Sequence, residues 1–313
     1  MIGAEWKKLL RQRWLIGIAI LLIFVDVGLF LNTQYTEKKD RVAAVPLFAE
    51  YQKETADMTN EQAQEYLTDQ LNTLSNFQFV QIALNGEVDE GLLQGLVEEN
   101  PNILEEYQQA GYEEDPLALM TKIQVISELL GQYQNVSGYQ AYLESIQTQY
   151  EQMKDSSFYE GRPYAEAQGK KTTEDFAKLQ GTEPEIGMNW GVEALMEEQI
   201  SSEILILLAL GICIVLVSQD RTHDLFGLLR SCRRGHGCLI AAKFAIALTA
   251  VLFLGISVYG SQIAIAWKLY GMGNLNRPMQ SVNELNESAR QLTVGGYLLD
   301  YYLRHLIAVL VLT

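Results

Sequence analysis

Long, nearly uninterrupted runs of apolar residues limit what this chain can fold into. They cover residues 14–31, 204–217, 244–267 and 306–313, and a polar block, 32–200, separates the first two. A helix needs about 20 apolar residues to cross a hydrocarbon core of ~30 Å, and in lipid only helices and closed barrels satisfy every backbone hydrogen bond. The sequence therefore predicts an all-α, polytopic membrane protein with a large, mainly helical domain between spans 1 and 2.

The apolar run 14–31 predicts a membrane span rather than a cleaved signal peptide. It is longer than the hydrophobic region of a signal peptide, and polar residues follow it instead of a small-residue cleavage site. We expect the other spans at 200–218 and 244–267, and the start of a fourth at 297–313. Because the last apolar run is too short for a crossing, we expect the 313 residues to be the front part of a longer protein.

Positive charge predicts the orientation of these spans. Residues 1–13 carry several cations beside apolar residues, which indicates an amphipathic helix in the lipid interface, and the stretch 219–243 is also basic. Basic segments next to spans remain in the cytoplasm. We therefore expect 1–13 and 219–243 to be cytoplasmic, and the domain 32–199 and the loop 268–296 to be extracytoplasmic, in a bacterial cell membrane.

The polar domain offers no constellation for catalysis. The chain has a net charge of -16, most of its acid lies in 32–200, and this block contains neither histidine nor cysteine. These features argue against nucleic-acid binding, a zinc site and a histidine-based triad. Elsewhere, the spacing of Cys232, His236 and Cys238 matches no zinc pattern. We expect no enzyme activity, metal or cofactor in this chain.

Local signals within the polar domain predict helices. Thr59 and Gln62 fit a capping box before a helix, and Asp115 and Pro116 fit the first positions of another. We expect that second helix to end at Gly131. The stretch 156–191, which is richer in glycine, proline and lysine, is expected to be mostly loop.

Asp26 is an ionisable residue inside the first apolar run. A carboxylate at this depth costs on the order of 2.5–3.5 kcal/mol on insertion scales, so its side chain should face protein or water. Two interpretations remain open. Asp26 lines a transport pathway, or it lies in the outer part of the span, where it is protonated or hydrogen-bonded to a neighbouring helix.

The stretch 219–243 carries a family resemblance. Its elements are Asp224-Leu-Phe-Gly227, Leu228-Leu-Arg-Ser231, Arg233-Arg-Gly235 and Leu239-Ile-Ala-Ala-Lys243. With the amphipathic N-terminus and the large insertion after span 1, this pattern resembles the permease subunits of bacterial ABC-2 type ABC transporters. The chain departs from that pattern because no proline follows Ser231, and because Gln219-Asp220 stands where a glutamate is common.

The resemblance implies that this loop docks on a separate ATP-binding subunit. An apolar and cationic surface suits a short helix seated in a partner's groove, although the same residues could rest on the lipid interface. The expected docking residues are Leu225, Phe226, Leu228, Leu229, Arg230, Arg233 and Arg234. The implied partners are the ABC ATP-binding subunit, which would hold ATP and Mg²⁺, a second permease chain and membrane lipid. Export is the implied direction of transport.

A membrane sensor or receptor is the alternative interpretation. In that case the polar domain would bind a ligand and the cytoplasmic loop would transmit the signal. No signalling module follows the spans in these residues, which favours the permease.

Overall fold

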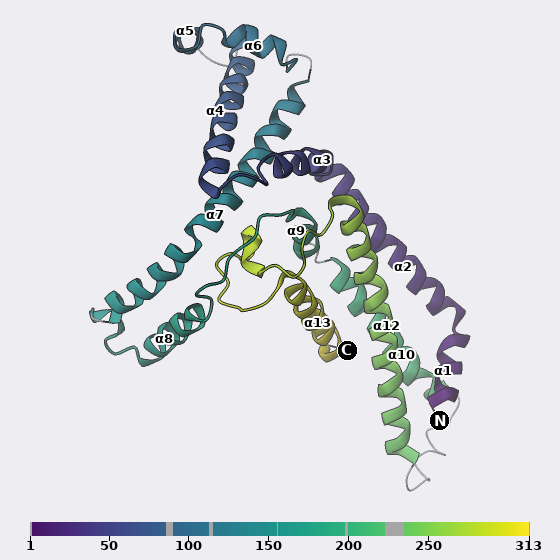
Figure 1. Cartoon of the computed structure of the whole chain (residues 1–313). Coiled ribbons are helices and arrows are strands. Elements are labelled where there is room, and N and C mark those ends of the chain that lie inside the picture. The colour runs from purple at the N-terminus through teal and green to yellow at the C-terminus, as the bar shows by residue number, and fades with distance from the viewer. Residues whose placement is uncertain are drawn as a thin grey trace. The chain divides into compact units, whose positions relative to one another are not determined.

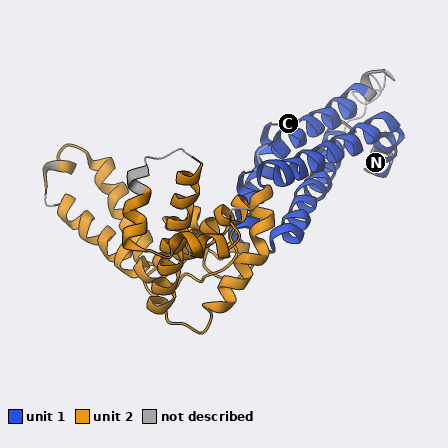
Figure 2. Ribbon diagram, turned by 90° about the horizontal axis from the view of Figure 1, so that it is seen from above, with its two compact units in different colours: residues 1–38, 190–272, 296–313 blue, residues 39–189, 273–295 orange. Residues whose placement is uncertain are grey.

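The computed structural model describes residues 2–85, 90–112, 115–154, 156–197, 200–222 and 235–312. In these residues the regular elements are helices, and one isolated bridge joins Pro278 to Thr293. The chain divides into two compact units (Figure 2). Unit 1 comprises residues 1–38, 190–272 and 296–313, and unit 2 comprises residues 39–189 and 273–295. The predicted all-α class is confirmed for the described residues.

Four helical segments of the described chain are long and apolar enough to cross a membrane (Figure 1). They are α2 (Arg13–Asn32) with the π-helix η1 (Thr33–Glu37), α10 (Ile200–Thr222), α12 (Gly235–Tyr270) and α13 (Val294–Leu312). The first lies near the N-terminus and a long helical region separates it from the second. The protein is therefore a polytopic membrane protein.

The fourth of these helices differs from the prediction. α13 begins at Val294 and has 19 residues, which gives a length of about 28 Å. The start of a fourth span was expected at 297–313, and α13 begins three residues earlier. The tyrosine-rich first half is helical too, and Asp300 and Arg304 form an i,i+4 ion pair there at 2.9 Å.

The N-terminal helix packs against the spans. α1 (Ile2–Arg11) ends at a break at Gln12, which lies outside helical geometry (φ -81, ψ 77), and α2 follows directly. Leu9 of α1 and Leu15 of α2 join one buried apolar cluster with Ile212 of α10 and Ile246 of α12. The start of the chain is thus part of the core of unit 1.

α12 also packs closely against α13. A Cβ atom at Gly255 would lie 2.7 Å from Cδ1 of Leu306, so glycine permits the close approach of the two helices. Val258 and Val309 are buried in the same contact. The short helix α9 (Trp190–Glu197) also belongs to unit 1, and Gly191 at its start leaves no room for a side chain against the Gly271 carbonyl.

Unit 2 is built around the long helix α7 (Pro116–Lys154), against which α4 (Asn60–Leu84) packs lengthwise. The other elements are α3 (Lys39–Glu54), α5 (Glu90–Glu99), α6 (Ile103–Gln109), η2 (Ser157–Tyr159), α8 (Pro163–Ala177), η3 (Met279–Ser281) and η4 (Asn283–Leu285). The capping box of Thr59 and Gln62 is confirmed. Asp115 Oδ1 accepts a hydrogen bond from the Ala118 amide at 3.1 Å, which confirms the predicted start of α7.

Two local predictions in unit 2 were wrong. α7 continues through Gly131, where buried neighbours such as Leu129 and Tyr133 hold the helix together despite a cost of about 1 kcal/mol for glycine. Residues 163–177 form α8 rather than a loop. Phe176 of α8 is buried against Tyr139 and Leu143 of α7, so tertiary packing stabilises a helix of weak intrinsic tendency.

The segment 273–295, which lies within the loop predicted at 268–296, belongs to unit 2 and contributes to its core. Met279 and Val282 are buried, the Asn135 side-chain amide donates to the Gln280 carbonyl at 3.1 Å, and that of Asn283 donates to Glu128 Oε1 at 2.8 Å. Unit 2 therefore combines one long segment that precedes α10 with one short segment that follows α12.

Arg277 fastens the short segment to the long one. Its side chain is 1% exposed, and Nη2 donates hydrogen bonds to the Met188 carbonyl at 2.8 Å and to Asn189 Oδ1 at 2.7 Å. A Cβ atom at Gly187 would collide with Nη1, so a larger residue here would force the buried guanidinium to move. Burial lowers the pKa of the Arg277 guanidinium, and the nearby Glu185 carboxylate partly opposes this.

Candidate functional site in the membrane-spanning unit

One face of the first span is buried, and its residues recur at a spacing of four. Asp26, Phe30 and Gln34 are all buried at this spacing, whereas Leu21, Phe24 and other apolar residues of the span are exposed. Residues four apart lie on the same side of a helix. The buried face of this span therefore carries two polar residues, Asp26 and Gln34, with Phe30 between them, and its opposite face is apolar and exposed.

Asp26 lies in a three-residue hydrogen-bonded cluster. The Ser201 hydroxyl donates to Asp26 Oδ1 at 2.7 Å, and Gln262 Nε2 donates to Asp26 Oδ2 at 3.3 Å and also to Ser201 Oγ. The exposed fractions are 2% for Asp26 and 1% for each of the other two side chains. The three residues come from α2, α10 and α12, so the cluster forms only where these three candidate spans meet.

Two further polar contacts join the same helices. The Tyr270 hydroxyl donates to Gln34 Oε1 at 2.6 Å, and Gln34 belongs to the π-helix η1. Such π-helical turns are often found at functional sites. Ser202 and the Tyr259 hydroxyl are hydrogen-bonded at 3.2 Å, and the Tyr259 ring packs on Tyr302 with centroids 4.6 Å apart. The polar contacts of the bundle therefore gather near the end of α2, the start of α10 and the end of α12.

The groups that bond to Asp26 are neutral. Within the described residues, Lys38 pairs with Glu197 at 3.1 Å and Arg304 pairs with Asp300, and no lysine, arginine or histidine forms an ion pair with Asp26. A buried carboxylate in a membrane span without a cationic partner is a candidate functional group by default. The structure thus shows Asp26 inside the helix bundle and hydrogen-bonded to neighbouring helices.

The predicted docking residues lie outside the described part of the chain. Leu225, Phe226, Leu228, Leu229, Arg230, Arg233 and Arg234 all fall within 223–234. The described flanks are the end of α10 at Thr222 and the start of α12 at Gly235. Near these ends, the Lys243 ammonium donates to the Leu216 carbonyl, which joins α12 to α10.

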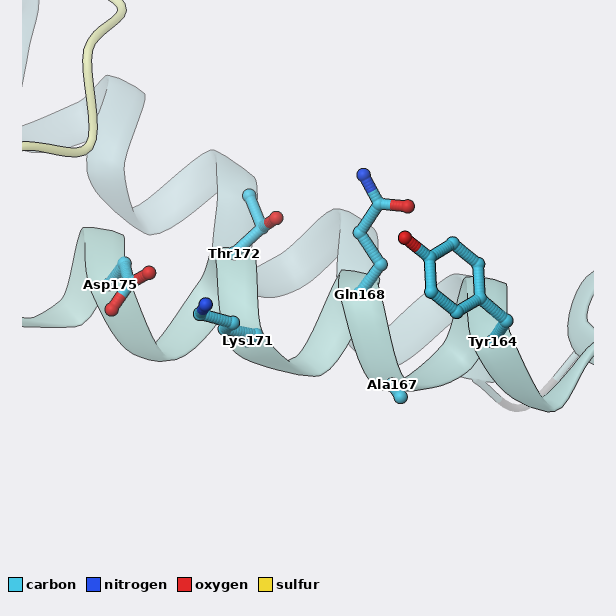
Figure 3. A pocket seen from close by; sticks show the side chains of 6 residues that line it. All are labelled: Tyr164, Ala167, Gln168, Lys171, Thr172 and Asp175. Carbon is cyan, nitrogen blue, oxygen red and sulfur yellow. The ribbon is translucent and has the colours of Figure 1, made fainter. Parts of the chain in front are cut away.

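A surface hollow on unit 2 is a weaker candidate site. Its lining residues, Tyr164, Ala167, Gln168, Lys171, Thr172 and Asp175, all belong to α8 (Figure 3). They follow one stripe of a single helix, so no second element encloses a ligand. Lys178 binds Asp175 Oδ1 at 2.6 Å and lowers the pKa of that carboxyl. The described residues also contain no group of three or more histidine, cysteine or acidic side chains that could hold a metal.

Ser201, Gln262, Gln34 and Tyr270 were not predicted as site residues. A signal was available, because hydroxyl and amide side chains within or beside apolar runs favour contacts between membrane helices. Their partners could not be assigned from the sequence, since Asp26 is separated from Gln262 by 236 residues.

No family model matches this chain, and comparisons with curated proteins and with solved structures also found no match. The class of protein therefore rests on the four candidate spans and the helical region that follows the first of them.

Proposed function

We propose that this chain is the permease subunit of an ATP-driven ABC transporter that works as an exporter. ATP would be hydrolysed by a separate subunit docked on the loop 219–243. The observation that carries the proposal is that unit 2 is built from two separate segments of the chain, one before α10 and one after α12.

Two crossings of a membrane return a chain to the side from which it left. Because segments 39–189 and 273–295 fold into one unit, we expect both to lie on one side of the membrane, with α10 and α12 as the two crossings between them. The loop between α10 and α12 then faces the opposite side. With this topology, a partner protein could bind the connection between α10 and α12 on the side of the membrane opposite unit 2.

The charge of the loop supports a cytoplasmic partner. Arg230, Arg233 and Arg234 belong to this loop. Lys7 and Lys8 belong to α1, which precedes the first span and is expected on the same side of the membrane as the loop. Cationic loops stay in the cytoplasm, where ATP-binding subunits are found. Hydrolysis in such a subunit can drive transport only if it favours one permease conformation over another. The loop 219–243 is the segment through which we expect that bias to pass.

The docking proposal is tested by replacing Leu228 and Leu229 with aspartate. If Leu228 and Leu229 pack against the ATP-binding subunit as proposed, aspartates at these positions should weaken the complex of the two subunits roughly tenfold or more, because an unpaired charge is costly to bury. The measurement is co-purification of the ATP-binding subunit with tagged chain from detergent-solubilised membranes. The expected result is loss of the ATPase while the amount of chain in the membrane stays unchanged.

A matched control is the double change Leu84→Asp and Leu117→Asp. These leucines are 55% and 54% exposed in unit 2, so they receive the same charges outside the loop. The control should retain the ATPase. If the ATPase stays bound to the Leu228 and Leu229 variant, or leaves both variants equally, docking through this loop is wrong. A sensor with no ATP-binding partner would yield no ATPase even with the unaltered chain.

A further inference from the structure

We infer that Asp26, Ser201 and Gln262 bind a monovalent alkali cation between α2, α10 and α12. Its role in transport rests on the proposed function. The permease would carry this cation or use its gradient. The binding site itself rests on the contacts of the three side chains.

Oxygen atoms from two helices converge on one donor group. Gln262 Nε2 contacts both Asp26 Oδ2 and Ser201 Oγ, and Ser201 Oγ lies 2.7 Å from Asp26 Oδ1. The amide NH₂ group thus occupies the point at which negative charge and lone pairs gather. A cation is favoured at the same point for the same electrostatic reason.

Rotation of the Gln262 amide by half a turn changes the character of this point. The movement replaces Nε2 by Oε1 and adds an oxygen to those of Asp26 and Ser201. Carboxylate, hydroxyl and amide oxygens are the ligands that hard cations prefer. Gln262 therefore donates hydrogen bonds to Asp26 and Ser201 when no cation is bound, and its amide oxygen becomes a ligand when the cation is bound.

The charge of the cluster selects a monovalent ion. Asp26 supplies one negative charge, and the groups bonded to it are a hydroxyl and an amide. The neighbouring pair of Ser202 and Tyr259 is neutral as well. One alkali cation would neutralise the buried carboxylate, whereas a divalent ion would leave a net positive charge in the bundle. Isolated buried charge is costly in either sign.

Binding would also depend on how the spans are arranged. Each ligand residue belongs to a different helix, so separation of α2 from α10 or α12 removes ligands and weakens the site. A conformational change that moves these helices therefore changes cation affinity, and by linkage the cation favours the packed arrangement. This behaviour is what a transport cycle requires of a bound cargo or coupling ion.

The experiment measures thermal unfolding of the full chain in detergent by tryptophan fluorescence. All four tryptophans, at positions 6, 14, 190 and 267, lie in unit 1, so the signal reports on the unit that contains the site. Chloride salts of Na⁺, Li⁺ and K⁺ are compared with N-methyl-D-glucamine at equal ionic strength. At saturation, at least one alkali cation should raise the unfolding temperature by roughly 3 °C.

Three variants locate the effect. Asp26→Asn keeps the shape of the side chain but removes its charge and should abolish the alkali-specific shift. Ser201→Ala removes one ligand and should reduce the shift, and it remains informative if Asp26→Asn fails to fold. Ser202→Ala is the matched control, because this adjacent serine bonds to Tyr259 and should leave the shift unchanged.

The inference is overturned if the unaltered chain shows no alkali-specific shift, or if the shift persists in both Asp26→Asn and Ser201→Ala. Neither result bears on the ATP-binding partner, which is tested separately by co-purification. Conversely, loss of the docking proposal would leave cation binding by the three residues intact as a measured property.

Discussion

Buried polar side chains are used differently in the two units. In unit 1 the contacts of Asp26 with Ser201 and Gln262, and of Gln34 with Tyr270, join side chain to side chain. In unit 2 the buried side chains bond largely to backbone. Gln280 Nε2 donates to the Ser288 and Arg290 carbonyls at 3.0 and 2.8 Å, and the Asn189 side-chain amide donates to the Ser281 carbonyl at 3.2 Å.

Backbone geometry explains this difference. The helices of unit 1 largely satisfy their own amides and carbonyls, and Asp26, Gln262 and Gln34 are hydrogen-bonded to side chains of neighbouring helices. The segments 183–189 and 273–293 of unit 2 are largely irregular, and their buried backbone groups need side-chain partners. Polar residues therefore specify contacts between helices in one unit and the path of the chain in the other.

The largest effect on this comparison is expected from Gly187→Ala. The added methyl group collides with the Arg277 guanidinium, which is enclosed and cannot move freely. Overpacking of this kind costs about 1–3 kcal/mol. Chemical denaturation of the full chain, followed by hydrogen exchange of peptides from α7 and 273–295, measures the loss in unit 2.

Gly131→Ala is the matched control for this change. Nothing lies within 4 Å of a Cβ atom built at Gly131, which is inside α7, so alanine should stabilise the helix by about 0.5–1 kcal/mol. Both glycines belong to unit 2, so neither change is expected to alter the stability of unit 1. If Gly187→Ala proves as harmless as Gly131→Ala, the tight enclosure of Arg277 is wrong.

A smaller effect is expected from Tyr270→Phe in unit 1. The change removes the hydroxyl that donates to Gln34 at 2.6 Å and leaves the ring in place. Single hydrogen bonds between membrane helices contribute about 0.6 kcal/mol on average and about 1.7 kcal/mol at most. Tryptophan-detected unfolding in detergent should show a loss in this range. A loss well above it would mean that unit 1 depends on its polar contacts more strongly than unit 2 does.

The smallest effect at neutral pH is expected from Tyr139→Phe in unit 2. The Tyr139 hydroxyl is buried and has no hydrogen-bond partner among the described residues, so its removal should change the free energy of unfolding by less than about 1 kcal/mol. Burial raises the pKa of Tyr139 to about 12 from 10.0, and nearby Tyr142 adds to the increase. The distinguishing measurement is therefore the stability of the protein in alkali.

The sign of this pH dependence follows from proton binding. Above pH 10 the unfolded chain loses the tyrosine proton while the folded chain retains it, so stability falls as pH rises toward about 12. Tyr139→Phe should lose less stability than the unaltered chain over this range. Tyr51 and Tyr142, whose pKa values burial also raises, leave a residual dependence. Identical alkaline curves for both proteins would contradict the assignment to Tyr139.

The same difference between the units explains what the sequence could predict. Asp26 is conspicuous because it is an acid within an apolar run, and its burial in a helix bundle was foreseeable. Its partners Ser201 and Gln262 are neutral and carry no signal of their pairing. The first three spans were recognisable from composition alone, whereas the tyrosines of α13 obscured the start of the fourth.

The core of unit 2 was harder to predict for a physical reason. Arg277 and Gln280 lie in a polar, irregular stretch whose composition is typical of an exposed loop. Their burial depends on carbonyl groups of segments that are distant in the sequence, which no local pattern encodes. Similarly, α8 is held by the contact of Phe176 with Tyr139 and Leu143, and α7 continues through Gly131 beside the buried Leu129 and Tyr133. Local propensity predicted the opposite at both places.

The divided composition of unit 2 has a consequence for biosynthesis. A ribosome that has completed 39–189 must still synthesise residues 190–272 before the second segment of the unit exists. At 5–20 residues per second this interval is roughly 4–17 s. During that time Asn135 and Glu128 lack the partners that 273–295 later provide. Unit 2 therefore reaches its final set of contacts only after residues 190–272, which include the candidate spans α10 and α12, have been synthesised.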